Sequence, residues 1–583
     1  MNNSYRIQVI LAALLPALFL SCTKDVMPSF PSAMTTAEDL TPSSSVAVPE
    51  DEEDAIANTK FARTITLVWS STGVDVSGDD NGIVSVSGTH VTVNATNTKE
   101  KIRYELSGSC DDGSFKVYSN NKQCFSFNGL TLTNPSGAAV NNQGKKRCFV
   151  VVNGTNTLSD GASAAYTATE EEDLKAVFFS EGQLIFSGTG SLAINALNAM
   201  GKAALTTDDY IHVMEDGPSI TVSSGSSAGN GIRGKEYILI SGGTIRATVA
   251  AAMKKGFSSD SLVVITGGET TISASGGTAY DEDDGDWSGS AGIKADYGFK
   301  MTGGTVNITN TGQGGKGLRV GGSSEKGVHI FTSEVSGGTL TINVTGSNDT
   351  SHDVSAKGVK VGWAVESSTK GPGAPPGGGP GGGGMGGESN TYSDMTGDFI
   401  ISGGVVRVKS ANAEAFEVKR TLTVSDGELF AYSNGDDAIN SGSTLTITGG
   451  KVCGISTAND GIDANGNFYI KGGIVYASGK GSPELALDAN SEGGFKLYIQ
   501  GGTVVAIGGI ESGASVSQPS KTLSSWGRNV WYGITSGSTS FAFKTPSSGG
   551  NGLYCYGSST PSVSSGVNVS GTSFWDGYGN ADF

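Results

Sequence analysis

A short alternating strand followed by a Gly-Gly or Asp-Gly corner recurs along this chain, and this repeat is the feature that most constrains its fold. Examples are ILISGGTIRATVA at 238–250, LTITGGKVCGIST at 445–457 and LYIQGGTVVAIGG at 497–509. The second glycine of the corner recurs every 23 residues at Gly404, Gly427, Gly450 and Gly473. A fixed period of this length predicts stacked equivalent units, each of which packs on its neighbours.

One unit, residues 445–469, shows how the chain turns. LTIT and KVCGIS alternate with period two on either side of Gly449-Gly450, as half-buried strands do. A turn with Asn and Gly then leads into a third short strand at 462–464. Three short strands and three corners predict an all-β chain, a right-handed parallel β-helix with coils of about 23 residues. A sandwich or a propeller does not fit this period.

The first 22 residues predict export. Arg6 precedes an apolar run that is too short to span a bilayer and that ends in Leu20-Ser21-Cys22. This pattern resembles a bacterial lipoprotein signal, which implies lipidation of Cys22 and a place at the outer membrane or cell surface. A plain secretory signal with an incidental cysteine is the alternative. Residues 23–60 are rich in Ser, Thr, Pro and acid, and we expect them to form a flexible tether.

The remaining chain divides into a long repeat region and a short end. We expect the β-helix to occupy residues 61–510, interrupted by a Gly/Pro-rich insertion at 370–396 that cannot pack. Residues 511–583 are predicted to be an end cap or a small C-terminal module. Five cysteines follow Cys22; Cys110 and Cys124 could pair in an oxidising compartment, and the odd number leaves at least one free.

The net charge of the chain limits the classes of partner that it can bind. The formal charge of −18 argues against binding nucleic acid or an anionic membrane by bulk electrostatics. We therefore expect contact with a membrane only through the lipid anchor, no nucleic-acid partner and a monomeric chain. A polyanionic ligand would need a local basic patch or bridging cations.

Several corners resemble a known family. NDGIDANGNFYIKGG at 459–473, DDAINSGSTLTITGG at 436–450 and GNGIRGKEYILISGG at 229–243 are similar to the repeated signature of secreted bacterial carbohydrate-binding β-helix proteins. The resemblance covers roughly residues 62–510. It implies a pectate-lyase-like fold, binding of plant-type polysaccharide such as cellulose and acidic sugars, and calcium held in the turns. It does not imply lyase activity.

Asp and Asn side chains at the corners are the candidate calcium ligands. Stacked turns bring equivalent side chains together, and calcium takes six to eight oxygen ligands. Ordinary turn chemistry, which also favours Asp and Asn, is the alternative. A second acidic cluster at 281–286 is more simply a solvated loop. The predicted metal ligands are Asp436, Asp437, Asn440, Asp460, Asp463 and Asp488.

Basic side chains replace the acidic ones at other corners, and only Asp460-Gly461-Ile462-Asp463 keeps the full family pattern. The segments GIRGK, GIKAD, GLRVG and GVKVG predict either a basic stripe that grips an acidic glycan or charge balance for nearby Asp. Aromatic faces suit pyranose rings, so two tryptophans near insertions join the candidates. The predicted carbohydrate-binding residues are Arg233, Lys235, Lys294, Arg319, Lys360, Trp287 and Trp363.

Three functions remain open on the sequence. The first is a non-catalytic, calcium-supported carbohydrate-binding protein, and the second is a calcium-dependent polysaccharide lyase on the same fold. In such a lyase Lys316 or Lys357 could join the stripe as the base, but the sequence distinguishes none of the lysines. The third is a structural or adhesive surface rod. Trp526, Trp531 and Tyr532 are expected to cover the open end of the stack.

Overall fold

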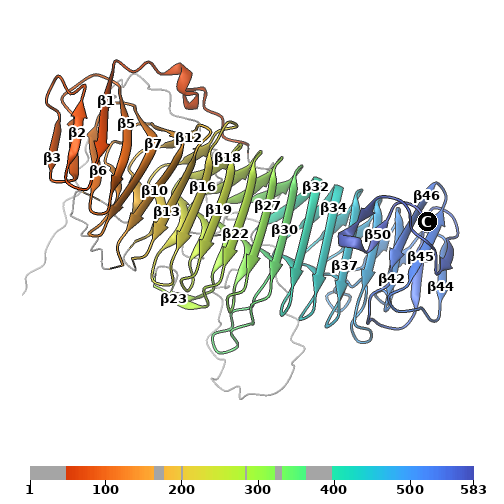
Figure 1. Cartoon of the computed structure of the whole chain (residues 1–583). Coiled ribbons are helices and arrows are strands. Elements are labelled where there is room, and N and C mark those ends of the chain that lie inside the picture. The colour runs from red at the N-terminus through yellow and green to blue at the C-terminus, as the bar shows by residue number, and fades with distance from the viewer. Residues whose placement is uncertain are drawn as a thin grey trace, which may run out of the picture.

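The computed structural model describes residues 47–162, 172, 176–198, 201–282, 285–321, 331–362 and 397–583. Within these ranges the chain is all-β and forms one elongated stack of strands (Figure 1). Short 3-10 turns are the only helical elements in the described ranges: η2 (Glu52–Asp54), η3 (Ile56–Asn58) and η6 (Trp575–Gly577). No helix in the described part is long and apolar enough to cross a membrane. The predicted lipidation site Cys22, the insertion at 370–396 and Trp363 lie outside the described residues.

The unit expected over residues 445–469 is present. It consists of β36 (Leu445–Ile447), β37 (Lys451–Ser456) and β38 (Ile462–Ala464), and β39 (Phe468–Ile470) opens the next unit. β36 pairs in parallel with β39, and β38 pairs in parallel with the equivalent strand of the preceding unit. Parallel pairing between units, with no hairpin inside a unit, excludes an antiparallel sandwich for this region.

Two strands of each unit enter a 29-stranded sheet. Besides β36, β37 and β39, its strands are β1 (Arg63–Trp69), β2 (Val74–Ser77), β5 (Ile102–Cys110), β7 (Gln123–Asn134), β9 (Cys148–Asn153), β10 (Thr155–Asp160), β12 (Leu184–Ser187), β13 (Ser191–Ala196), β15 (Ile211–Val213), β16 (Ser219–Ser224), β18 (Tyr237–Ile240), β19 (Thr244–Val249), β21 (Leu262–Ile265), β22 (Glu269–Ala274), β26 (Gly298–Met301), β27 (Thr305–Asn310), β29 (Thr332–Val335), β30 (Thr339–Val344), β32 (Asp398–Ser410), β34 (Leu422–Ser433), β40 (Ile474–Ser478), β41 (Leu497–Ile499), β42 (Thr503–Ile507), β43 (Ser515–Val516), β44 (Ser520–Leu523) and β47 (Leu553–Tyr556).

The third strand of each unit enters a 14-stranded sheet, the smaller sheet. Its strands are β3 (Val84–Ser87), β4 (His90–Ala95), β6 (Ser114–Ser119), β8 (Val140–Asn142), β11 (Ala176–Ser180), β14 (Ala203–Thr207), β17 (Asn230–Gly234), β20 (Lys255–Ser259), β25 (Ala291–Ala295), β28 (Lys316–Val320), β31 (Val359–Val361), β33 (Phe416–Val418), β35 (Ile439–Ser441) and β38. The less regular region 61–235 contributes strands to both sheets, so its strands belong to the same stack.

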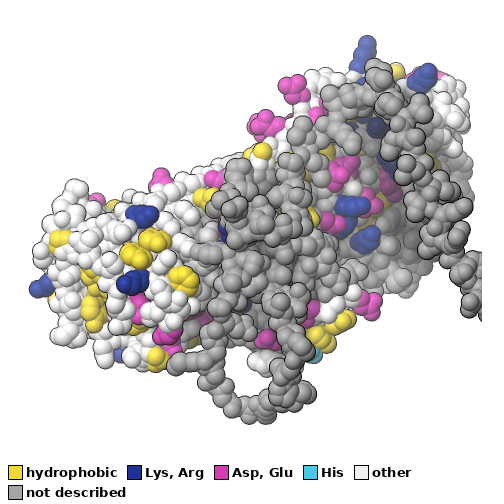
Figure 2. Space-filling view, turned by 180° about the vertical axis from the view of Figure 1, so that it is seen from behind, with side chains coloured by type: hydrophobic (Ala, Val, Ile, Leu, Met, Phe, Trp, Pro, Cys, Tyr) yellow, Lys and Arg dark blue, Asp and Glu magenta, His cyan; other side chains and the backbone are white. Residues whose placement is uncertain are grey.

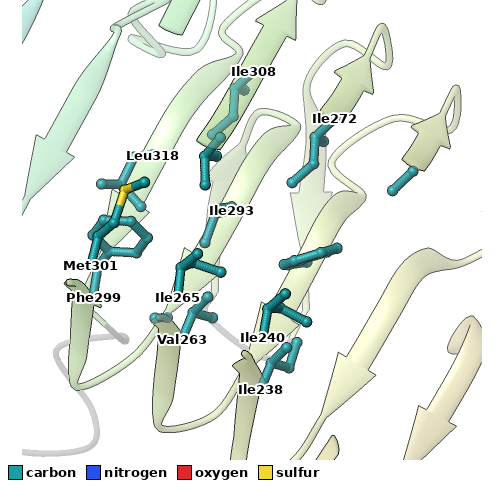
Figure 3. Close-up of a cluster of buried hydrophobic side chains, with 14 of the residues drawn as sticks. Ile238, Ile240, Val263, Ile265, Ile272, Ile293, Phe299, Met301, Ile308 and Leu318 are labelled. Carbon is teal, nitrogen blue, oxygen red and sulfur yellow. The ribbon is translucent and has the colours of Figure 1, made fainter. Parts of the chain in front are cut away.

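The interior of the stack is a continuous apolar core. Side chains at alternate positions point inward, as the period-two pattern requires. Figure 3 shows Val263, Ile265 and Ile272 facing Ile293 across the interior, with Ile308 from the next unit stacked beside them. All five side chains are at most 2% exposed. Burial of such repeated columns is the main source of stability in a stack whose units contact only their neighbours.

The acidic N-terminal segment is packed on the body where the structure describes it. This differs from the tether expected over 23–60. Asp54 is 3% exposed and accepts hydrogen bonds from Arg147 Nε and Tyr210 Oη, each at 2.7 Å. His212 Nδ1 lies 2.7 Å from the other carboxylate oxygen. Three carboxylates of this segment, those of Asp51, Glu53 and Asp54, pair with the buried Arg147, which favours order over disorder.

The C-terminal region closes the stack. β47 pairs antiparallel with both β42 and β44, which ends the parallel run of the larger sheet. A separate five-stranded antiparallel sheet follows, formed by β45 (Trp531–Ser536), β46 (Thr539–Lys544), β48 (Ser562–Ser565), β49 (Ser573–Phe574) and β50 (Gly579–Asn580). Tyr532, Trp526 and Trp575 pack in the hydrophobic cluster that joins it to the stack. The covering role expected of the first two therefore agrees with their positions.

The five described cysteines are buried and free. The pairing considered for Cys110 and Cys124 is therefore absent. Both side chains lie inside apolar surroundings, at 4% and 0% exposure, where they pack as small hydrophobic residues.

The corner glycines can be tested directly. Gly450 has φ of +71°, and an added Cβ would lie 2.8 Å from the Asp426 carbonyl carbon in the unit below. Gly494 also has positive φ, +85°, but its added Cβ would meet nothing within 4 Å. We expect Gly494→Ala to lower the free energy of unfolding by ~1–2 kcal/mol from backbone strain alone. Gly450→Ala should lower it by ~3 kcal/mol or more, since the backbone clash adds to the strain.

Chemical denaturation followed by circular dichroism measures both values. Equal losses for the two variants would contradict the close stacking of corners between units.

Candidate functional site

Residues from many units form one line on the smaller sheet. The parallel register pairs Lys294 with Arg319, Arg319 with Lys360 and Lys360 with Glu417 on four successive strands. The same line continues from Glu417 to Asn440 and from Asn440 to Asp463. Because Leu487 bridges Ile462 in parallel, Asp488 follows next. We call Lys294, Arg319, Lys360, Glu417, Asn440, Asp463 and Asp488 the charged column.

The column has a basic half and an acidic half. Predicted glycan-binding residues occupy the first part, and predicted metal ligands occupy the second. Figure 2, seen from the side opposite to Figure 1, shows acidic and basic side chains lying next to one another toward the N-terminal end of the stack. The structure therefore joins two groups of candidates that the sequence treated separately. Neighbouring side chains in such a column are ~4.8 Å apart, so like charges repel strongly.

Local carboxylates balance some of the basic side chains. Arg233, two strands before Lys294, lies 2.8 Å from Asp260 and 3.5 Å from Asp208. Lys294 lies 2.6 Å from Asp296. For these two residues the charge-balance interpretation agrees with the contacts.

Glu417 is the seam between the halves. Its carboxylate is 2% exposed and lies 2.7 Å from Lys357 Nζ and 2.5 Å from Lys419 Nζ. Lys357 also lies 2.7 Å from Glu414. Burial alone would raise the pKa of Glu417, but these lysines and Lys360 hold it below its ordinary value. Lys357 is thereby neutralised, and its own pKa is raised by Glu417 and Glu414 against the effect of burial.

Three lysines of the basic half have lowered pKa values. Burial lowers the pKa of Lys360 to about 8 against the effect of Glu417, and it lowers that of Lys255 to about 7; nearby cations lower both further. Lys316, whose Nζ donates to the Gly314 carbonyl at 2.9 Å, has its pKa lowered by burial and by Lys360, Arg319 and Lys357. Lys255 and Lys316 lie three positions before the column on β20 and β28 and are each 7% exposed.

Sequence reasoning missed Lys255. The pattern Lys-Gly-apolar recurs at 255–257, 316–318 and 357–359, and it would have identified the position. Conversely, Lys235 lies beyond the end of β17 and outside the column.

Trp287 lies on the hairpin β23 (Ala279–Asp281) and β24 (Asp286–Ser288). Its ring stacks on His352 with centroids 3.4 Å apart, and the adjacent Ser288 Oγ accepts a hydrogen bond of 2.7 Å from Arg319. The hairpin therefore contacts the basic half, but one face of Trp287 is already covered. A sugar could use only the other face.

The acidic half brings carboxylates close together. Asn440 Nδ2 donates to Asp463 at 2.8 Å and to Asp437 at 3.1 Å, so a single amide bridges two carboxylates. Burial raises the pKa of Asp437 and Asp463, and neighbouring carboxylates raise them further. Burial also raises the pKa of Asp460 to about 6. Asp436 lies at the edge of this group and accepts from the Asn459 side chain at 2.7 Å.

The donor chemistry of this half fits calcium. All the candidate ligands are carboxylate or amide oxygens, and Asp488 Oδ1 is buried without a hydrogen-bond partner. Among the described residues, however, no three acidic, His or Cys side chains are already arranged as a metal site. A complete set of ligands is therefore not preformed, and a cation would have to draw the carboxylates together.

Comparison with known proteins finds one matching family model. Residues 87–251 match the family model of carbohydrate-binding domain-containing proteins. The matched span contains Arg233 and Lys235 but ends before Lys255 and the charged column. No curated protein matches the chain.

A solved structure described as the polysaccharide lyase-like protein from C. thermocellum, gadolinium derivative, is similar at 18% identity with a TM-score of 0.32. The match covers 49% of this chain and 93% of that one. A TM-score this low supports no shared site.

The raised carboxylate pKa values predict a pH effect on stability. A carboxyl whose pKa rises on folding from its ordinary value of 3.8 favours the folded state at low pH, and this contribution is lost as pH rises. Without divalent cations, Asp437→Asn should therefore raise the melting temperature at pH 8. At pH 4 the carboxyl is protonated in the folded state and only partly ionised in the unfolded state, so the variant should change the melting temperature little. Differential scanning calorimetry in chelator at both pH values measures this, and a stabilisation that is equal at both would contradict it.

Proposed function

We propose that this chain is an exported lipoprotein that binds acidic polysaccharide on a right-handed parallel β-helix. The observation that carries this proposal is the grouping of Lys294, Arg319 and Lys360 on successive strands, with the buried Lys255 and Lys316 beside them. The match of residues 87–251 to a carbohydrate-binding family supports the ligand class. In the regular units each strand pairs in parallel with the equivalent strand of the next unit, and this pairing supports the helical path of the chain.

An anionic ligand explains why the cations are grouped. Each buried lysine lowers the charge state of the next, so the folded protein keeps the cluster at an energetic cost. A glycan carboxylate at this position removes the mutual repulsion and receives charge-assisted hydrogen bonds. Uronic acids bring such carboxylates in a regular series. Neutral sugars gain nothing from the cluster, so the site favours acidic glycans.

Calcium is the second part of the proposal. Asp437, Asn440 and Asp463, whose side chains already lie within hydrogen-bond distance of one another, would hold the ion. Asp460 and Asp488 are near enough in the register to complete or support the set. Bound calcium would neutralise the repulsion that now raises the pKa of these carboxyls. It would stabilise the acidic half without taking part in any reaction.

Cys22 would attach the chain to the outer membrane or cell surface. A protein held in this way presents its charged column to glycans outside the membrane.

A polysaccharide lyase is the second candidate. Lys255 and Lys360 have pKa values near neutrality, so each is partly unprotonated where it could accept a proton from a uronate. Arg319 would hold the uronate carboxylate. A structural surface rod is the third candidate function, and no specific contact favours it.

Binding is tested with polygalacturonate. Replacing Lys294 and Lys360 together with Gln should weaken binding about tenfold, since two charged contacts of up to ~1 kcal/mol each are lost. The control is Lys496→Gln, which removes one exposed lysine away from the column. Titration calorimetry at low and high salt measures the affinity. No binding by the parent protein would reject the proposal, and unchanged binding by the double variant would place the ligand elsewhere.

The same samples separate binding from catalysis. A rise in ultraviolet absorbance from unsaturated product would identify a lyase, and Lys255→Gln or Lys360→Gln should then abolish it. A flat trace with retained polysaccharide identifies a binding protein.

Calcium is tested by melting. Millimolar calcium should raise the melting temperature of the parent by several degrees, through binding to the folded state alone. Asp463→Asn should remove most of that increase, whereas Asp286→Asn, on the hairpin, should keep it. An equal melting temperature in calcium and in chelator would exclude a structural calcium in the acidic half.

A further inference from the structure

The larger sheet carries a pair of stacked tyrosines near its C-terminal end. Tyr469 on β39 and Tyr498 on β41 are paired in the parallel register, and both side chains are half-buried between inward-facing core residues. Their ring centroids are 4.9 Å apart, with 13° between the ring planes. This distance matches one strand step of ~4.8 Å, so each ring covers one face of the other along the axis of the stack.

The second face of Tyr469 is covered by the chain itself. Lys471 Nζ lies over this ring, 5.0 Å from its centroid. Because a gap of 4.9 Å between the two rings leaves no room for an ammonium group, Lys471 lies on the face turned away from Tyr498. Both faces of Tyr469 are therefore occupied, and a ligand cannot stack on this ring.

The second face of Tyr498 meets only small side chains. Its partner one step further is the exposed Ser515 on β43. The next strand, β44, pairs with β47 instead, so within the described residues the parallel column ends at Ser515. Ser517 Oγ donates to the Ile499 carbonyl at 3.3 Å, and an added Cβ at Gly513 would meet nothing within 4 Å. A serine side chain cannot cover a phenol ring, so this face of Tyr498 is left accessible.

An accessible aromatic face at this place suits a sugar ring. A pyranose with equatorial substituents presents a flat face of C–H bonds, which packs on the electron-rich face of an aromatic ring without any charge. Such a ring would occupy the position that a third tyrosine would take in the stack, and Ser515 Oγ could bond to a sugar hydroxyl. β-linked neutral sugars have this flat face, whereas the axial linkages of polygalacturonate interrupt it. The match of residues 87–251 to a carbohydrate-binding family supports sugar as the ligand class.

We propose that Tyr498 and Ser515 form a second carbohydrate site, in which a pyranose of a neutral, β-linked polysaccharide stacks on Tyr498. The inference goes beyond the proposed function, because neither the ligand nor the residues are those of the charged column. The site lies at the end of the parallel run, so a glycan chain can pass across the end of the stack on either side of the bound ring.

Titration of the full chain with xylohexaose and cellohexaose, at high salt and in chelator, tests this site. High salt screens the charged column but leaves stacking unchanged. Tyr498→Ala should weaken binding about fivefold to tenfold, as loss of an aromatic contact does. Ser515→Tyr should weaken it by more than about tenfold, because the new ring takes the place of the sugar. Ser515→Ala is the matched control and should bind within about twofold of the parent.

The melting temperature of each variant is measured first. Tyr498→Ala also removes the stack with Tyr469, so Ser515→Tyr decides if Tyr498→Ala does not fold. Ser515→Tyr changes an exposed residue and should melt at the temperature of the parent or above it, since it extends the stack of rings. Lost binding in a variant of undiminished stability would then come from the covered ring face.

Three results would overturn the inference. They are no binding of either hexamer by the parent, equal binding by the parent and Ser515→Tyr, and self-association of the parent that Ser515→Tyr removes, which would assign the ring face to a second copy of the chain. The proposed function is judged separately. Ser515→Tyr should bind polygalacturonate as the parent does, and the double replacement of Lys294 and Lys360 should leave binding of the neutral hexamers unchanged.

Discussion

The in-register parallel pairing of successive units is the constraint on which the rest of this structure depends. It keeps each residue beside its equivalents one unit away, so a sequence position becomes a line of side chains. Inside the stack such lines are apolar and stabilise one another by burial. On the smaller sheet the same rule lines up Lys294, Arg319 and Lys360 whether or not their charges are compatible. Electrostatic repulsion there is a direct consequence of the backbone hydrogen bonds.

Glycine at the corners makes this register possible. Gly404, Gly427 and Gly450 all have positive φ, and each added Cβ would press on the corner backbone of the unit below. Any other residue would push the units apart and shift the lines of side chains. The corner pattern was readable in the sequence because only glycine satisfies both conditions. This explains why strands, corners and the unit length could be predicted from the sequence.

The site was less predictable, for physical reasons that particular residues illustrate. Lys294, Arg319 and Lys360 were found because they share one position after a corner glycine, and Asn440 and Asp463 because they lie in turn-like segments. That Glu417 joins the two groups required the register across β31, β33 and β35, which passes over a long insertion in the sequence. Lys255 was missed because its charge state depends on burial and on cations from other units. The packing of Asp54 against Arg147 depends on residues 93 apart, which no local pattern indicates.

The change of charge sign at Glu417, the seam, explains the electrostatics of both the basic and the acidic half of the column. Where the two signs meet, Lys357, Lys419 and Glu414 form compact ion pairs, and no external charge is needed. Away from the seam, burial and neighbouring like charges lower lysine pKa values on one side and raise carboxyl pKa values on the other. Burial is the larger cause of both shifts, and the alignment of like charges at the strand spacing adds to it. The charge of the column therefore changes sign at Glu417, between the basic strands and the acidic ones.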